Sequence, residues 1–286
     1  MNSCIIILNY NDGKRAADLA LTLAEYQLPN HIVLVDNCSA DDSFQLMSSM
    51  TSKAANIHVI QTAQNGGYAK GNNFGIRYAL ANFEIDYIFV ANPDIMVTEQ
   101  TLSAILSAMA AHPQYGAMSC LVNQGYNVWR LPGFFGMIES LFLIWFNLDK
   151  RSIKKKLAAS AKDVETVGVT EGSFFCMSAG AYCCCKGFDE RTFLYVEENI
   201  LARRLKNAGY AEGVLTKERY DHFHSVSIKK KYKSSKARAF HLFYDSMNLY
   251  NREYLHTNPL QNGIFNACFF LAYLERVLYD LIQRIR

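Results

Sequence analysis

Residues 3–36 read SCIIILNYNDGKRAADLALTLAEYQLPNHIVLVD, and this stretch decides the fold class. A short aliphatic run, Cys4–Leu8, comes first. A helical pattern follows from Lys14 to about Tyr26, and a second aliphatic run ends the stretch at His31–Asp36. Continuous aliphatic runs of this length are typical of strands buried on both faces. A strand, a helix and a second strand in this order predict a right-handed βαβ unit with parallel strands.

The same alternation continues to about residue 122. Further strands are expected at 56–61, 87–91 and 116–122, with helices at 41–50, 70–82 and 99–111. Beyond them, SFFCMSAGAYCC (173–184) predicts a strand and a turn, and 197–207 predicts a helix that Gly209 ends. The sequence therefore predicts an α/β protein with a mainly parallel, Rossmann-like sheet flanked by helices.

The chain is expected to divide at about residue 228. Residues 1–228 form the α/β domain, whose halves are 1–122 and 123–228, and residues 229–286 form a helical tail. This tail opens with KKKYKSSKAR (229–238), which has six basic residues and no acid. A charge run of this kind is either a solvated segment or a contact for an acidic surface.

Composition excludes several classes of protein. Half of the 286 residues are hydrophobic and 19% are charged, so the chain can bury a core and is not disordered. The net charge of +3 is too small to indicate nucleic-acid binding. None of the eight cysteines forms a Cys-x-x-Cys pair, and the N-terminus lacks the basic region of a signal peptide. We therefore expect a reduced, cytoplasmic protein.

Two segments approach the composition of a membrane helix without reaching its length of about 18 apolar residues. They are 133–148 and 264–282, and each lies next to basic residues. Such helices suit the surface of an anionic membrane, and they equally suit packing inside the protein. The C-terminal one also fits a homodimer, and the sequence leaves these uses open.

Polar side chains follow each of the first four predicted strands. They are Asn9, Tyr10 and Asn11 after the first strand, Asp36 and Asn37 after the second, the loop 65–73 after the third, and Asn92, Pro93 and Asp94 after the fourth. In an open parallel sheet, ligands bind beyond the carboxyl ends of the strands. The sequence therefore predicts one ligand site at this edge.

The loop NGGYAKGNN (65–73) combines glycines with a lysine. Gly66 and Gly67 allow the backbone to approach a ligand closely, and Lys70 can reach a diphosphate. The loop has neither the G-x-G-x-x-G spacing of a dinucleotide site nor the Gly-Lys-Ser/Thr of a P-loop. It is therefore another kind of anion-binding loop or a plain helix start.

Two carboxylates at this edge each have two possible uses. Asp36 could accept the imide N–H of uracil or thymine, although an Asp after a strand commonly begins a turn. Asp94 could hold Mg²⁺ or Mn²⁺ together with phosphate and water, or it could also be a turn residue.

Six motifs in order carry a resemblance to a known family. They are ILNYN, VDNCSADDS, NGGYAKGNNFGI, ANPDI, EGSFFCMSAGAYCCCKGFDERTFLYVEEN and HFHSVS. Together they resemble the family 2 inverting glycosyltransferases of the GT-A fold, and most closely the rhamnosyltransferase-type members of O-antigen and capsule assembly. The resemblance runs from Ile5 to about Ser227.

The resemblance implies roles for individual residues. It implies a divalent metal, Mn²⁺ or Mg²⁺, held by Asp94 and by His222 or His224. It implies a nucleotide-sugar site made from residues at the strand ends and in the loop: Asn9, Tyr10, Asn11, Asp36, Asn37, Asn65, Gly67, Lys70, Asn72, Asn73, Asn92 and Pro93.

The catalytic base is expected in Glu197-Glu198, with Glu198 in the place of the carboxylate that deprotonates the acceptor. An inverting displacement needs one carboxylate for that proton, whereas acids are also common in the first turn of any helix. Relatives usually carry Asp at the position of Glu198 and often an acid at Ile200. Arg203 and Arg204 follow, so acceptor geometry or activity could differ.

The resemblance implies an enzyme that moves a sugar from a dTDP- or UDP-sugar, with dTDP-rhamnose among the candidates, to a lipid-diphosphate-linked saccharide. Such a protein is expected on the inner face of the cytoplasmic membrane. One alternative is a non-catalytic sugar-nucleotide-binding or scaffold subunit, which the altered region 197–200 favours. A sugar-1-phosphate nucleotidyltransferase is disfavoured, because Asn9–Gly13 does not supply a glycine-rich loop with basic residues.

Overall fold

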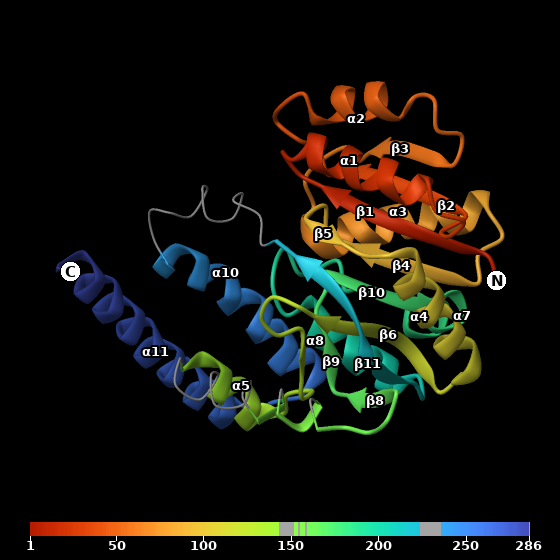
Figure 1. Cartoon of the computed structure of the whole chain (residues 1–286). Helices are drawn as coiled ribbons and strands as arrows, with labels where there is room; N and C mark the ends of the chain where they lie inside the picture. The colour runs from red at the N-terminus through yellow and green to blue at the C-terminus, as the bar shows by residue number, and fades with distance from the viewer. Residues whose placement is uncertain (143–151, 154, 158, 224–235, 286) are drawn as a thin grey trace.

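The computed structural model describes residues 1–142, 152–153, 155–157, 159–223 and 236–285 (Figure 1). Its strands are β1 (Ser3–Asn9), β2 (His31–Asp36), β3 (Ile57–Gln61), β4 (Tyr87–Ala91), β5 (Ile95–Met96), β6 (Tyr115–Val122), β7 (Val128–Trp129), β8 (Val164–Val167), β9 (Val169–Thr170), β10 (Phe174–Ser178) and β11 (Ala211–His222). Its helices are α1 (Gly13–Ala24), α2 (Ser43–Thr51), α3 (Gly67–Asn82), α4 (Glu99–Ala111), α5 (Phe134–Leu141), α7 (Ala179–Cys185), α8 (Glu197–Asn207), α10 (Lys236–Leu249), the π-helix η1 (Tyr250–Tyr254) and α11 (Pro259–Ile285).

The central sheet is mixed, with a parallel first half. Within the described ranges its order is β3-β2-β1-β4-β10-β6-β11-β5, and β8 pairs with β11. Strands β3, β2, β1 and β4 run parallel, as the alternating pattern predicts. Strand β10 is antiparallel to both β4 and β6. Because β1, β2 and β4 share one direction, their carboxyl ends and the polar residues after them lie at one edge.

Two hydrophobic cores cover the two faces of this sheet. Side chains alternate along a strand, so Ile5 and Ile7 of β1 pack with α1, α2 and α4 on one face. Cys4 and Ile6 pack with α3, α7 and α8 on the other. The aliphatic runs of the sequence are therefore strands buried on both faces, as expected.

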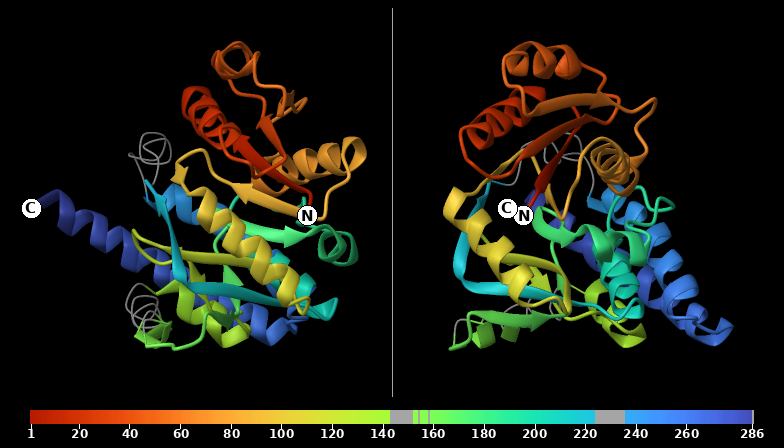
Figure 2. Two further views of the ribbon diagram at one scale, coloured as in Figure 1. Left: turned by 45° about the vertical axis from the view of Figure 1, so that its right-hand side comes forward. Right: turned by 90° about the vertical axis from the view of Figure 1, so that its right-hand side faces the viewer.

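The C-terminal helices share a third core with the α/β body. Val196 and Ile200 of the α8 region pack there against Met247 of α10 and Phe265 of α11, together with Met137 of α5. Figure 1 shows α5, α10 and α11 side by side, and the left view of Figure 2 shows α11 running outward toward the C-terminus. The helical tail predicted after residue 228 is thus packed onto the body, while the predicted boundary and most of the basic run fall outside the described residues.

One local prediction is wrong, since a helix stands where a turn was expected. The residues after β10 form α7, because the Ser178 side chain accepts a hydrogen bond from Ala181 N and caps the helix. The first apolar segment begins as α5, which ends at Leu141, and residues 143–148 lie outside the described residues. In the ranges that the structure describes, no helix is both long enough and apolar enough to cross a membrane. All eight cysteines are free.

A buried carboxyl group in β11 makes stability depend on pH. Glu212 is 4% exposed and accepts hydrogen bonds from Thr170 N at 2.6 Å and Thr170 Oγ1 at 2.9 Å. Burial raises the pKa of Glu212 to about 8, and the charge of Glu198 adds to the increase. Between its ordinary value of about 4.3 and this value, the folded chain keeps a proton that the unfolded chain releases. Stability from this group is therefore greatest below that window and is lost as the pH rises through it.

Glu212→Gln removes the titrating group, so the variant no longer differs at this position in bound protons between its folded and unfolded states. We expect the free energy of unfolding of the variant, relative to the wild type, to rise by up to about 1.4 kcal/mol per pH unit between about pH 5 and pH 7. Urea unfolding at several pH values measures the difference. Parallel pH profiles for the two proteins would show that Glu212 is ionised in the folded chain.

Candidate functional site

The carboxyl ends of β1 and β2 are joined through two buried side chains. Asn9 and Asp36 lie opposite each other in the sheet, and Asn9 Nδ2 donates to Asp36 Oδ1 at 2.9 Å. Asp36 also accepts from Ser39 N, Ser39 Oγ and Gln61 Nε2. Four donors thus occupy the acceptor positions of this carboxylate, so it organises the loops after both strands. Its recognition of a nucleotide base stays a prediction and requires one of these donors to move.

The residues next to this pair fix the surrounding loops. Asn11 Oδ1 accepts from Ala40 N at 2.8 Å, and Tyr10 beside it is half-buried. Asn37 Nδ2 donates to Asn65 Oδ1 at 3.0 Å and to Gly67 O at 3.1 Å. These bonds connect the end of β2 to the glycine-containing loop before α3.

Gly67 brings this loop against the segment that leads to Glu197 and Glu198. Its φ is +84°, and a Cβ at this position would lie 2.0 Å from Phe193 O. The next residue, Tyr68, donates its N–H to the same oxygen at 3.0 Å. Only glycine fits both the backbone angle and the close approach.

The first turns of α3 carry Lys70, Asn72 and Asn73. Lys70 is half-buried and its side chain lies along Gly66, where an added Cβ would be 2.5 Å from Lys70 Cδ. Asn72 is buried and donates to Tyr68 O within the helix. Asn73 Nδ2 donates to Phe188 O and to Glu190 Oε1. Asn73 therefore holds the loop after α7, and the charge of Lys70 lies close enough to help lower the pKa of Glu190.

A second polar group lies at the end of β4, where Asp94 meets His222 of β11. The distance from His222 Nε2 to Asp94 Oδ1 is 3.3 Å, and both side chains are buried. Asn92 and Pro93 lead into this turn, and Asn92 N donates to Ser173 O at 2.8 Å. Burial would lower the pKa of His222, but the hydrogen bond and charge of Asp94, with the charge of Glu171, raise it. His224 lies outside the described residues.

Asp94 and His222 fit a divalent metal that receives its other ligands from elsewhere. Adjacent ligands of an ion with bonds of about 2.1 Å lie about 3 Å apart, close to the observed separation. A carboxylate oxygen and an imidazole nitrogen both suit Mn²⁺. In the part of the chain that the structure describes, no three His, Cys, Asp or Glu side chains group to hold a metal. A diphosphate and water would have to complete such a site.

Glu198 lies in the first turn of α8 and is partly exposed. Its Oε1 accepts from Gly172 N at 3.2 Å, and Tyr68 donates its hydroxyl to Gly172 O at 2.5 Å. Removal from water raises the pKa of Glu198, and the charge of Glu171 raises it further. Raised carboxyl pKa values are a common property of catalytic bases.

Glu197 has a different environment although it is the neighbouring residue. It is 3% exposed, and its Oε2 has no hydrogen-bond partner among the described residues. Burial raises the pKa of Glu197, and the charge of Glu198 adds to the increase. Glu197 is thus favoured in its protonated form, and Glu198 is the more exposed carboxylate of the pair.

The segment Glu171–Gly172 joins the two parts of the site. Glu171 Oε2 lies 4.0 Å from His222 Nδ1, and the next residue binds Glu198 and Tyr68. The structure therefore brings the predicted base Glu198, two of the predicted metal residues (Asp94 and His222) and the loop before α3 to one edge of the sheet.

Sequence analysis did not assign individual roles to three residues near this edge. Glu171 belongs to the motif EGSFFCMSAGAYCCCKGFDERTFLYVEEN, in which it was given no role of its own. Burial raises the pKa of Asp12, and the nearby charge of Asp94 adds to the increase. Trp129 Nε1 donates to Asn199 Oδ1 at 2.7 Å, next to the predicted base. The position of Glu171 in the same motif as Glu197-Glu198 was a usable signal, while Trp129 lies outside all six motifs.

Comparison with known proteins gives one family match and several relatives. The family model described as glycosyl transferase family 2 matches residues 4–164. An N-acetylglucosaminyl-diphospho-decaprenol L-rhamnosyltransferase of Mycobacterium tuberculosis is 24% identical over 221 residues, which are 72% of this chain and 71% of that protein. The low-salt glycan biosynthesis hexosyltransferase Agl10 of Haloferax volcanii is 33% identical over 98 residues, which are 34% of this chain and 29% of that protein.

Solved structures share the fold at low sequence identity. A mannosyltransferase of Pyrobaculum calidifontis, in complex with GDP-Man and Mn²⁺, has a TM-score of 0.61 and 14% identity, covering 98% of this chain and 75% of that one. TarS of Staphylococcus aureus, in complex with UDP-GlcNAc, has a TM-score of 0.54 and 15% identity, covering 96% of this chain and 73% of that one. The predicted GT-A fold is thereby confirmed.

Proposed function

This chain belongs to glycosyl transferase family 2, and from this premise we propose that it transfers a sugar, with inversion, from a nucleoside diphosphate to a lipid-diphosphate-linked saccharide. One observation carries the proposal. The segment Glu171–Gly172 connects a partly exposed carboxylate with a raised pKa, Glu198, to the buried pair Asp94–His222. A base for the acceptor and a site for the leaving diphosphate thus lie at one edge.

In the proposed reaction Glu198 takes the proton of the acceptor hydroxyl. The acceptor oxygen forms a bond to the anomeric carbon as the bond to the diphosphate oxygen breaks on the opposite side, and the diphosphate keeps that electron pair. A divalent metal, when bound, neutralises negative charge on the leaving diphosphate. Asp94 and His222 would hold it, and Lys70 is placed to add a positive charge.

The donor is proposed to lie along the ends of β1, β2 and β4. Asn9, Asp36 and Asn37 organise the base and ribose end of this site through their bonds to neighbouring loops. Gly67 lets the loop before α3 pack against Phe193 O, and Asn65 accepts from Gly67 N at 3.0 Å to fix that turn. We propose a dTDP- or UDP-sugar, such as dTDP-rhamnose.

The acceptor class rests on the Mycobacterium tuberculosis relative, which is named for a sugar carried on diphospho-decaprenol. We propose a comparable lipid-linked saccharide and a role in O-antigen or capsule assembly. Helix α11 offers a surface for its lipid, because it exposes several large apolar side chains: Leu260, Phe270, Leu271, Leu274, Leu278 and Leu281.

We expect the protein to sediment with vesicles that contain anionic lipid. Leu271→Glu combined with Leu278→Glu places two charges on the exposed face of α11, and this variant is expected to stay in the supernatant. Both proteins are compared by gel filtration without lipid. The membrane contact would be contradicted if the wild type did not bind the vesicles. If the wild type also ran as a dimer and the double variant as a monomer, this face of α11 would instead contact a second copy of the chain.

The reaction is tested by incubating the protein with Mn²⁺, a panel of nucleotide sugars and synthetic diphospholipid-linked monosaccharides. The expected products are a free nucleoside diphosphate and a lengthened acceptor whose new linkage has the opposite anomeric configuration, determined by NMR. Retained configuration would rule out the single displacement. Donor binding without turnover for every acceptor would favour a non-catalytic subunit instead.

A further inference from the structure

We propose that the C-terminal helices α10 and η1 are positioning elements of the catalytic site, which hold the backbone before Glu198 in a conformation that it does not adopt alone. The inference rests on the proposed role of Glu198. It gives the C-terminal region a function in catalysis that is separate from any contact with a membrane.

The backbone immediately before Glu197-Glu198 is strained. Tyr195 has a φ of +73° and Val196 a φ of +69°, and neither residue is glycine. Positive φ is a genuine outlier for a β-branched residue such as Val196. Two consecutive residues of this kind persist only where their surroundings determine the conformation.

Helix α10 supplies these surroundings directly. Ser246 Oγ donates to Leu194 O at 3.1 Å, and the Phe243 ring stacks on the Tyr195 ring with centroids 4.1 Å apart and an interplanar angle of 17°. Val196 is buried in the same core as Met247. Leu194 and Tyr195 are thus each held by a side chain of α10, and Val196 is buried in the core that α10 helps to form.

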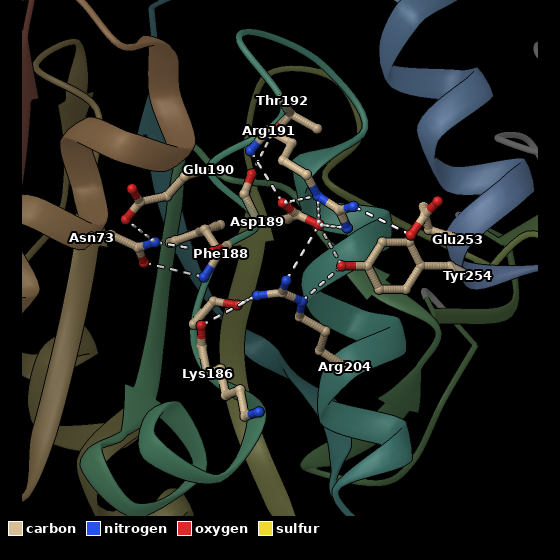
Figure 3. A network of polar contacts seen from close by, with 11 residues as sticks. Asn73, Lys186, Phe188, Asp189, Glu190, Arg191, Thr192, Arg204, Glu253 and Tyr254 are labelled. Atoms are coloured by element: carbon tan, nitrogen blue, oxygen red, sulfur yellow. Dashed lines mark hydrogen bonds and ion pairs between the residues drawn. The ribbon is translucent and has the colours of Figure 1, made fainter.

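The π-helix η1 holds the beginning of the same loop through a network of charged groups (Figure 3). Asp189 Oδ2 accepts hydrogen bonds from Tyr254 Oη at 2.6 Å and from Arg191 Nη2 at 2.7 Å. Arg191 Nη1 donates to Glu253 Oε2 at 3.2 Å. Burial would raise the pKa of Asp189, but hydrogen bonds from Arg191 and Tyr254 and the charge of Arg204 hold it well below its usual range. The carboxylate is therefore ionised and firmly bonded at neutral pH.

The unusual residues of α8 take part in this same contact. Ile200 is fully buried in the core shared with α10 and α11. Arg203 Nη2 donates to Tyr250 Oη at 3.1 Å, and Arg204 Nε donates to Tyr254 Oη at 2.8 Å. These side chains bind the C-terminal helices, so the departures from the family pattern after the glutamate pair provide the surface on which those helices pack.

The consequence for catalysis follows from the geometry. Without the contacts of α10, Tyr195 and Val196 can relax to negative φ, which changes the direction in which the chain enters α8. Glu198 lies in the first turn of that helix, so its carboxylate would shift relative to Gly172 and the acceptor. A misplacement of about 1 Å can cost about 100-fold in rate.

A matched pair of variants on α10 tests this. Phe243→Leu removes the ring that stacks on Tyr195. Phe240→Leu, one turn earlier, removes a ring that stacks on Phe269 of α11 at 4.3 Å and lies under Arg276. Both lose one aromatic ring from the same core, so a purely structural role predicts similar effects on activity.

We expect Phe243→Leu to lower kcat by about 10- to 100-fold, with KM for the donor unchanged, and Phe243→Tyr to restore kcat. Phe240→Leu is expected to lower the Tm but to keep kcat within about twofold. Equal losses of kcat in the two leucine variants, or no loss in either, would overturn the proposal.

Hydrogen exchange gives a readout that does not depend on the reaction. The amides of residues 194–200 are expected to exchange faster in Phe243→Leu than in Phe240→Leu, at equal protection in the central sheet. If exchange changes as expected while the wild type transfers no sugar, the proposed function is wrong, but α10 still fixes the conformation of the backbone before Glu198. Unchanged exchange in residues 194–200 would show that Phe243 does not fix the conformation of this segment.

Discussion

Replacing Glu198 with Gln is expected to lower kcat for sugar transfer by about 10² to 10⁴-fold, the usual contribution of a general base. The donor is expected to bind as before, because Glu198 lies beside Gly172 and Tyr68 and not beside the Asp94–His222 pair. Gln keeps the shape of Glu and can still face Gly172, but it cannot accept a proton. Rates of nucleoside diphosphate release under saturating substrates measure the effect.

The neighbouring residue provides the control. Burial raises the pKa of Glu197 and favours its protonated form, which Gln imitates. We therefore expect Glu197→Gln to lower kcat by no more than about tenfold. If Glu197→Gln abolished transfer while Glu198→Gln did not, the assignment of the base to Glu198 would be wrong.

The pH profile of the wild type tests the assignment of Glu198 as the base independently of the variants. In the proposed reaction Glu198 must be ionised to take a proton, so we expect the rate to fall as the pH drops through the pKa of Glu198. Because removal from water raises that pKa, the acid limb of kcat/KM is expected closer to neutrality than the ordinary carboxyl value of about 4.3. A flat profile down to about that value would contradict the raised pKa of this base.

Asp94→Asn is expected to have the second large effect, on donor binding. Asn keeps the size of Asp but removes the charge that pairs with His222 at 3.3 Å and that a divalent cation requires. We expect nucleotide-sugar affinity in the presence of Mn²⁺ to fall by at least about tenfold, or about 1.4 kcal/mol. Without the metal, the affinities of wild type and variant should converge. Titration calorimetry with and without chelator measures both.

The matched control removes a carboxylate from the same edge. Asp12 pairs with Arg15 at 3.3 Å, so Asp12→Asn loses a negative charge near Asp94 and leaves the pair with His222 intact. Its metal dependence should match that of the wild type. An equal loss of affinity in both variants would show that overall negative charge matters, and not a particular ligand.

Much of the fold could be predicted from the sequence because its signals are local. The run Cys4–Leu8 is a strand whose successive side chains enter opposite cores, and the polar residues after it stand where the strand ends. The grouping of Asp36, Asn65 and Asp94 at one edge follows from parallel strands alone. The order of the six motifs indicated the family, which the family match confirms.

Other features could not be predicted because they depend on contacts between distant segments. The positive φ values of Tyr195 and Val196 arise from packing against α10, about 50 residues later in the chain. The approach of Glu171 to His222 joins residues that lie about 50 positions apart in the chain. In the sequence, Ile200 stands where relatives often carry an acid. It is apolar because its side chain is buried in the core shared with α10 and α11.

Stabilisation of the wild type by nucleotide sugars tests the central claim most directly. A ligand that binds only the folded chain raises its melting temperature by mass action, whether or not the acceptor is known. We predict an increase for the sugars of one nucleotide, with uridine or thymidine as the base, that requires Mn²⁺ or Mg²⁺. If no nucleotide sugar moves the transition at millimolar concentration with either metal, the edge formed by Asp36, Lys70 and Asp94 is not a donor site.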